Sequence, residues 1–200
     1  MKYCILFASP RPNGNTATVL RPFAEQLEAC GNEVEIISLY GKRIEPCHAC
    51  RACQKDITRT GCVWNDDLQP IARKILQSDC IVTATPIYGW YCTAPMKAAL
   101  DRLIYMMCKF YGETRGPALW EGKAFAILTT CGYPPEKGAD VYEMGMKRYC
   151  RHCHLRYAGM YAAHDPGYAH PFATEAKLQG ARDFALRLHE LCSAQAAVAP

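Results

Sequence analysis

Four cysteines between residues 47 and 62 form the most specific chemical pattern in the sequence. Cys47, Cys50 and Cys53 are separated by two residues each, and Cys62 follows after a gap of eight. Three such thiolates can wrap one face of an iron–sulfur cubane, and a fourth can close it. Four thiolates also suit zinc, and a loop without any metal is the third alternative. These four cysteines are therefore our candidate metal ligands.

The other cysteines are expected to have structural roles. The chain has 13 cysteines and no recognisable secretory signal, so a disulfide framework is disfavoured. Cys150 and Cys153 form a further pair that we expect to pack inward at the end of a helix. Six scattered cysteines are expected to be small buried groups: Cys4, Cys30, Cys80, Cys92, Cys108 and Cys192.

A polar turn after the first apolar run has the composition of a phosphate-binding loop. Gly14 permits a close approach of backbone to ligand, and Arg11 can add a charge-assisted hydrogen bond. The free N–H groups of the helix that follows favour an anion at the same place. Donor side chains come from Ser9, Asn13, Asn15 and Thr16. A plain capped turn is the alternative, and neither a P-loop nor a Gly-x-Gly-x-x-Gly pattern is present.

Two later loops can complete a pocket around this turn. The segment 85–94 is rich in Pro, Tyr, Gly and Trp, and Tyr88, Trp90 and Tyr91 offer large rigid surfaces. The segment 129–135 contains Cys131 and Gly132. Local packing of an irregular segment would also explain the aromatic residues, and Cys131 would also serve as a small filler.

The elements that must position these loops alternate between strand and helix. Strands are predicted over 2–7, 33–39, 80–84, 123–128 and 156–162. Helices are predicted over 16–30, 66–77, 94–108, 138–150 and 174–195. Because Pro22 is awkward inside the first helix, that helix either begins near Leu20 or kinks. This alternation predicts an α/β fold with a parallel sheet covered on both faces.

The strand order 2-1-3-4-5 would bring the loops together. In that order the loops after strands 1, 3 and 4 are neighbours, and ligands bind beyond the carboxyl ends of such strands. Strand 2 borders strand 1 at about 4.8 Å. We therefore also expect the cysteine loop to lie at this ligand-binding edge.

Length and charge narrow the classes of function. The 200 residues suit one domain, 1–200, with a cysteine-rich insertion at about 46–63. Half of the residues are hydrophobic and 21% are charged, which is typical of a globular protein. No apolar run is long enough for a membrane span or a signal peptide, so we expect a cytoplasmic protein. The net charge of +4 is too small and scattered to indicate nucleic-acid binding.

The sequence resembles the NADPH-dependent FMN reductase and iron–sulfur flavoprotein family, which has a flavodoxin-like fold. The resemblance rests on four places in order: residues 9–16, the four-cysteine loop, residues 85–90 with 95–97, and residues 122–123 followed by 129–132. It implies a three-layer sandwich around a five-stranded parallel sheet of order 2-1-3-4-5.

The same resemblance implies where FMN binds. The phosphate would lie on Ser9, Arg11, Asn13, Asn15 and Thr16. The ribityl chain and ring edge would follow Pro86, Ile87, Tyr88, Gly89 and Trp90. The pyrimidine side would meet Thr130, Cys131 and Gly132. A 4Fe–4S cluster would bind Cys47, Cys50, Cys53 and Cys62, although the gap before Cys62 is longer than usual.

The implied activity is FMN-dependent NAD(P)H oxidoreduction, with a quinone, a flavin or another small molecule as acceptor. The alternative is an iron–sulfur flavoprotein that carries electrons without NAD(P)H turnover. Because the cofactor performs the chemistry, no catalytic acid or base is expected. A ferredoxin-like carrier is a candidate partner, and a homodimer or homotetramer is expected.

Overall fold

The computed structural model describes residues 1–167 and 169–196. Five strands form one sheet: β1 (Lys2–Phe7), β2 (Glu33–Ser38), β3 (Cys80–Pro86), β4 (Ala124–Cys131) and β5 (Arg156–His164). The helices are α1 (Asn15–Ala29), α2 (Leu68–Gln77), α3 (Ala94–Met107), α4 (Pro135–Gly138), α5 (Asp140–His152) and α6 (Glu175–Ala196). A single 3-10 turn, η1 (Ala52–Gln54), lies in the cysteine-rich segment.

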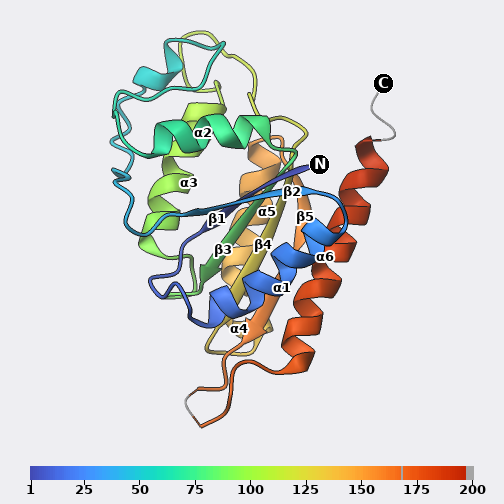
Figure 1. Cartoon of the computed structure of the whole chain (residues 1–200). Coiled ribbons are helices and arrows are strands. Elements are labelled where there is room, and N and C mark those ends of the chain that lie inside the picture. Colours follow the sequence, from blue (N-terminus) through green and yellow to red (C-terminus); the bar gives the residue numbers. More distant parts are fainter. Residues whose placement is uncertain (168, 197–200) are drawn as a thin grey trace.

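The sheet has the expected order and direction. All four strand pairs are parallel, and their order is β2-β1-β3-β4-β5. Two apolar layers cover it. Tyr3 and Ile5 of β1 pack under α1 and α6, whereas Cys4 and Leu6 face α2, α3 and α5. This alternation follows from the period of two residues in a strand. Figure 1 shows the two helical layers on opposite faces of the sheet.

Most predicted element ends are shifted by one or two residues, and three of the differences concern the loops around the site. β3 and β4 each run further than expected, so Thr130 and Cys131 are strand residues rather than loop residues. The β-branched threonines fit a buried strand well. The fourth predicted helix is divided into α4 and α5 at Ala139.

The first helix accommodates its proline. α1 begins at Asn15, ahead of Pro22, so a start near Leu20 is wrong. Pro22 lacks an N–H and removes one helical hydrogen bond. Val19, Phe23 and Leu27 are fully buried against the sheet, and this packing holds the helix despite the loss.

The lengths and hydropathy of the described helices can be compared with those of membrane-spanning helices. Among residues 1–167 and 169–196, no helix has both the length and the apolarity that a bilayer crossing requires.

Candidate functional site

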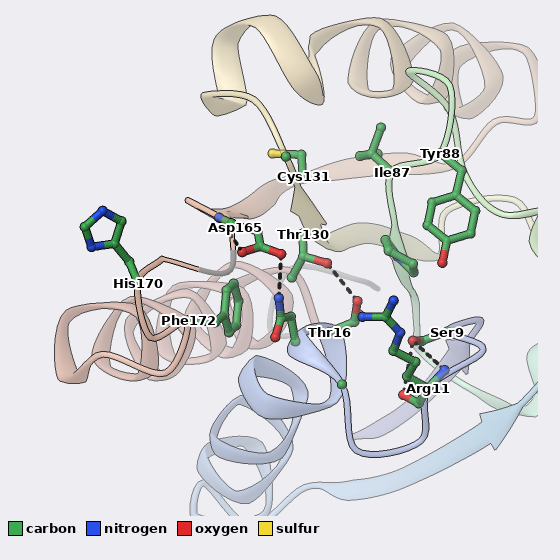
Figure 2. A pocket seen from close by; sticks show the side chains of 15 residues that line it. Ser9, Arg11, Thr16, Ile87, Tyr88, Thr130, Cys131, Asp165, His170 and Phe172 are labelled. Atoms are coloured by element: carbon green, nitrogen blue, oxygen red, sulfur yellow. Dashed lines mark hydrogen bonds between the residues drawn. The ribbon is translucent and has the colours of Figure 1, made fainter.

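A cavity of about 490 Å³ opens at the carboxyl ends of β1, β3, β4 and β5. Its volume lies in the range of small-molecule sites. We call it the main cavity, and Figure 2 shows its lining. It is lined by Ser9, Arg11, Gly14, Asn15, Thr16, Pro86, Ile87, Tyr88, Thr130, Cys131, Gly132, Asp165, Gly167, His170 and Phe172. The loops after strands 1, 3 and 4 therefore meet, as the strand order predicts.

The loop between β1 and α1 presents a positive end to the main cavity. The Ser9 hydroxyl accepts a hydrogen bond from the Arg11 backbone N–H (3.2 Å), and Gly14 N–H donates to Arg11 O (3.1 Å). A Cβ on Gly14 would lie 2.8 Å from the Arg11 Cβ, so only glycine fits this turn without a shift. No side chain caps α1 at Gly14, and its first turn has no acidic residue. The N–H groups of that turn therefore favour an anion.

Hydrogen bonds between loops fix the floor of the main cavity. The hydroxyls of Thr16 and Thr130 are 2.8 Å apart, which joins α1 to β4. The Ile87 N–H donates to Thr130 O, also at 2.8 Å, which joins the loop after β3 to the same strand. Figure 2 shows the two threonines facing each other at the centre of the site. Contacts within the chain therefore set the position of the floor.

The loop after β5 forms a fourth wall that the sequence analysis missed. Asn15 Nδ2 donates to Asp165 Oδ2 (2.8 Å), and the Gly167 N–H donates to Asp165 Oδ1 (3.0 Å). His170 and Phe172 follow in the same wall. The polar residues 165–167 and 169–172 come directly after β5, which neighbours β4, and this position was the available signal.

Three predicted cofactor residues lie outside the main cavity. The Asn13 side chain accepts a hydrogen bond from Arg21 instead. Gly89 and Trp90 line a second cavity of about 200 Å³, together with Ile87, Cys131, Gly132, Tyr133 and Gly138. We call this the aromatic cavity. It shares Ile87, Cys131 and Gly132 with the main cavity, so the two are adjacent.

Trp90 is held in a costly conformation at the rim of the aromatic cavity. Its φ of 64° is unusual for a residue with a side chain. The indole stacks on Tyr133, with ring centres 5.9 Å apart, and Nε1–H donates to Lys137 O (3.0 Å). Both rings remain about half exposed. Backbone strain that presents an exposed ring is characteristic of binding sites.

Cys131, between these cavities, is a neutral thiol. Burial raises the pKa of its side chain, and the nearby Glu136 carboxylate raises it further. The thiolate is the nucleophilic form of cysteine. Cys131 therefore contributes shape rather than reactivity.

The four candidate metal ligands surround a third cavity, which we call the cysteine cavity. Cys47, Cys50, Cys53 and Cys62 line it, with Arg102, Tyr105 and Met106 of α3 beside them. Its volume of about 20 Å³ would hold roughly one water molecule. Within the described part of the chain, no three His, Cys, Asp or Glu side chains converge as a single metal ion requires. A larger group would need the loop to open.

Two buried cations adjoin the cysteine cavity. Arg102 forms an ion pair with Asp66, and both side chains are almost completely buried. Burial opposes the charge on Arg102, but the hydrogen bond with Asp66, together with the nearby Cys62 sulfur, outweighs it and raises the pKa of the guanidinium. Lys109 is fully buried, and its Nζ donates to Cys53 O (2.7 Å). This environment suits an anionic group.

The cysteine cavity does not lie at the edge that holds the main cavity, so that prediction is wrong. The beginning of α3 is anchored at the main cavity's side, where Thr93 Oγ1 donates to Ala8 O (2.8 Å). The cysteine loop packs on the other end of the helix, where Gln54 Nε2 donates to Tyr105 O (2.6 Å). Tyr105 lies twelve positions after Thr93, which corresponds to about 18 Å along the helix. Figure 1 shows the chain after β2 running back along α3.

Most of the cysteines expected to be structural are buried. Cys150 and Cys153 pack inward, and burial raises the pKa of Cys150 to about 12. Of the six scattered cysteines, only Cys30 is not fully buried.

Comparisons with known proteins agree with this architecture. Residues 1–161 match the family described as NADPH-dependent FMN reductase. An iron–sulfur flavoprotein of Archaeoglobus fulgidus is 34% identical over 104 residues, which cover 52% of this chain and 46% of the relative. One from Methanocaldococcus jannaschii is 33% identical over 102 residues, or 51% of each chain. The chain thus spans about half the length of these curated relatives.

Solved structures share the fold. An NAD(P)H:quinone oxidoreductase from Methanothermobacter marburgensis has a TM-score of 0.71 at 21% identity, covering 94% of this chain and 97% of that one. A flavodoxin from the domain Archaea has a TM-score of 0.59 at 14% identity, covering 96% and 99%. The fold is therefore flavodoxin-like.

Proposed function

The chain belongs to the NADPH-dependent FMN reductase family, and from this premise we propose that it binds FMN in the main cavity. Electrons would pass from NAD(P)H through the flavin to a small-molecule acceptor. The observation that carries this proposal is the lining of the main cavity. The uncapped start of α1 and the ends of β3 and β4 all contribute to this lining. FMN supplies the hydride chemistry, and the chain binds and orients it.

The loop between β1 and α1 suits the phosphate of FMN. The first N–H groups of α1 and the Arg11 guanidinium provide positive charge on one side of the main cavity. The Asn15 and Thr16 side chains are held by Asp165 and Thr130. We therefore assign most of the phosphate binding to the backbone and Arg11.

The opposite side of the main cavity suits the flavin ring. Pro86, Ile87 and Tyr88 offer flat and apolar surface, and the Gly132 backbone lies beside the neutral Cys131 thiol. A flat aromatic ring with polar edges needs this combination of apolar faces and a few backbone donors. We place the ring here and the ribityl chain between Thr16 and Pro86.

Reconstitution followed by anaerobic reduction tests the proposal. Protein loaded with FMN is mixed with NADPH or NADH in a stopped-flow instrument, and bleaching of the flavin is recorded. Rapid bleaching supports the oxidoreductase. Stoichiometric FMN without bleaching would favour the alternative, an electron carrier without NAD(P)H turnover. A protein that takes up no FMN would contradict both.

We also propose that the aromatic cavity receives a planar electron acceptor, such as a quinone or a flavin. Replacing Trp90 by glycine removes the indole and suits the positive φ, while Tyr133→Ala removes its partner. Aromatic pairs contribute about 0.5–1.5 kcal/mol, so each change should raise the KM for a quinone roughly 2- to 12-fold. Steady-state kinetics with ferricyanide, which has no ring to stack, should change little.

Tyr40→Ala is the matched control for these two variants, since Tyr40 is similarly exposed but follows β2 and lines none of the three cavities. Equal losses with quinone and ferricyanide would show that the aromatic pair acts on the flavin and not on the acceptor.

A second proposal concerns the cysteine cavity, which we assign to an iron–sulfur cluster. It is supported by four cysteines around one space, by the buried cations Arg102 and Lys109, and by Arg102 donors that lack an acceptor. The chemistry and charge of these residues suit a thiolate-bound cluster of net negative charge, and the loop would open to admit it. Cys47, Cys50, Cys53 and Cys62 would hold it, and the cluster would supply one-electron exchange. Zinc is the alternative for the same thiols.

Serine at Cys47 or Cys62 should abolish iron binding and leave FMN binding intact, because the two cavities lie at opposite ends of α3. The measurement is iron, sulfide, zinc and FMN content after purification without oxygen. Cys30→Ser serves as the control, since Cys30 is partly exposed and remote from the cysteine cavity. If the unmodified protein contains zinc and no sulfide, the site binds zinc and the proposal of an iron–sulfur cluster is contradicted.

A further inference from the structure

Arg102 joins the two ends of the cysteine segment. Its Nη1 donates to Glu45 O (3.1 Å), just before Cys47, and to the carboxylate of Asp66, after Cys62. The Glu45 N–H in turn donates to Asp66 Oδ2 (2.9 Å). One buried side chain of α3 therefore closes the base of the loop that carries all four candidate ligands.

The remaining donors of Arg102 lack acceptors. Among the residues that the structure describes, Nε and Nη2 have no hydrogen-bond partner, although both atoms are fully buried. Arg102 is only 1% exposed and lines the cysteine cavity beside Cys62. Buried donors are nearly always paired in proteins, because an unpaired one loses its hydration without compensation. An acceptor inside the cysteine cavity would give both Nε–H and Nη2–H a hydrogen-bond partner.

Sulfur atoms with negative charge are suitable acceptors for these donors. We propose that Arg102 hydrogen-bonds the cluster sulfurs on the side of Cys62 through Nε–H and Nη2–H, and that these bonds raise the cluster's reduction potential. The inference rests on the proposed cluster. Negative charge on the sulfurs grows when the cluster gains an electron, so N–H donors stabilise the reduced form more than the oxidised form. Arg102 is thus a positioning and tuning residue, not a ligand.

A charge-neutral replacement separates this role from simple electrostatics. Arg102→Met combined with Asp66→Asn removes one positive and one negative charge together, so the net charge near the cluster is unchanged while the N–H donors disappear. Lys97→Met combined with Asp101→Asn is the matched control. That pair makes the same exchange of charges, and both of its residues lie on α3 with Arg102, but it is about half exposed and does not line the cysteine cavity.

The experiment is a redox titration of the anaerobically reconstituted proteins, followed by electron paramagnetic resonance, with dithionite as reductant. The double variant at 102 and 66 should lower the equilibrium constant for one-electron reduction at least tenfold, a shift of about 59 mV to more negative potential. The control pair should titrate like the unmodified protein. Arg102→Lys keeps the charge with a different donor geometry, and we expect an intermediate potential.

Each outcome decides a different point. Unmodified protein without iron and sulfide contradicts the proposed cluster and with it this inference. Iron and sulfide present, with the same potential in the double variant, contradicts the role of Arg102 alone. If the double variant does not fold or hold iron, the potential of Arg102→Lys decides, and a value equal to the unmodified protein's overturns the inference.

Discussion

Arg11→Met should weaken FMN binding by roughly 10- to 150-fold, with little effect on riboflavin. A hydrogen bond to a charged group contributes about 1.5–3 kcal/mol, and this range corresponds to that loss of affinity. Riboflavin lacks the phosphate that Arg11 would contact. The ratio of the two affinities, measured by fluorescence quenching or calorimetry, therefore isolates the phosphate interaction from ring binding.

Arg21→Met provides the control for this comparison. Arg21 lies on α1 two turns further on, and its guanidinium donates to Asn13 outside the main cavity. Its removal should change both affinities by less than about threefold, which is the scale of an exposed interaction. An equal loss of FMN and riboflavin in Arg11→Met would mean that Arg11 supports the loop's shape and leaves the phosphate to the N–H groups of α1.

Arg102→Met alone should destabilise the folded protein by about 3–5 kcal/mol, the usual cost of leaving one partner of a buried ion pair uncompensated. Asp66 is the partner, and its side chain is completely buried. Urea unfolding of the unmodified and variant proteins measures the difference. Adding Asp66→Asn should recover most of the loss, because the unpaired charge is then absent.

The same variant should respond to pH in a defined direction. In the unmodified protein burial opposes ionisation of Asp66, but the hydrogen bond from Arg102 wins and lowers the pKa of the carboxyl. Without Arg102 the backbone N–H donors of Glu45 and Leu68 remain, but the strongest contact that opposes burial is lost, so the pKa of the carboxyl in the folded variant rises. The deficit in stability should therefore shrink as the pH falls through that raised pKa. A deficit that is constant with pH would mean that the loss comes from packing.

Strong local patterns predicted the framework of the fold. The apolar run 2–7, flanked by a turn cluster, became β1, and the alternation with helices predicted the parallel sheet, whereas its order was implied by the resemblance to a flavodoxin-like family. The main cavity followed from that order, because the ends of adjacent parallel strands meet whatever the side chains are. Thr130 and Cys131 were placed in a loop since two threonines weaken the apolar signal, although burial makes them strand residues.

The path of the long cysteine segment could not be predicted from the fact that β2 lies next to β1. Strand order fixes where β2 ends, but the residues before α2 can run toward or away from the main cavity. Contacts distant in sequence decide the direction, namely Gln54 with Tyr105 and Arg102 with Glu45. The role of the residues after β5 was missed for a related reason, since Asp165 becomes recognisable only through its contact with Asn15, 150 residues earlier.

Helix α3 connects the regions of the two proposed binding sites. One end is anchored beside the main cavity and the other supports the cysteine segment, and the linings of the two cavities have no residue in common. If both proposed groups bind, loss of the iron to oxygen should leave a yellow protein that still folds. The proposed flavin and the proposed cluster could then each be assembled and titrated by itself.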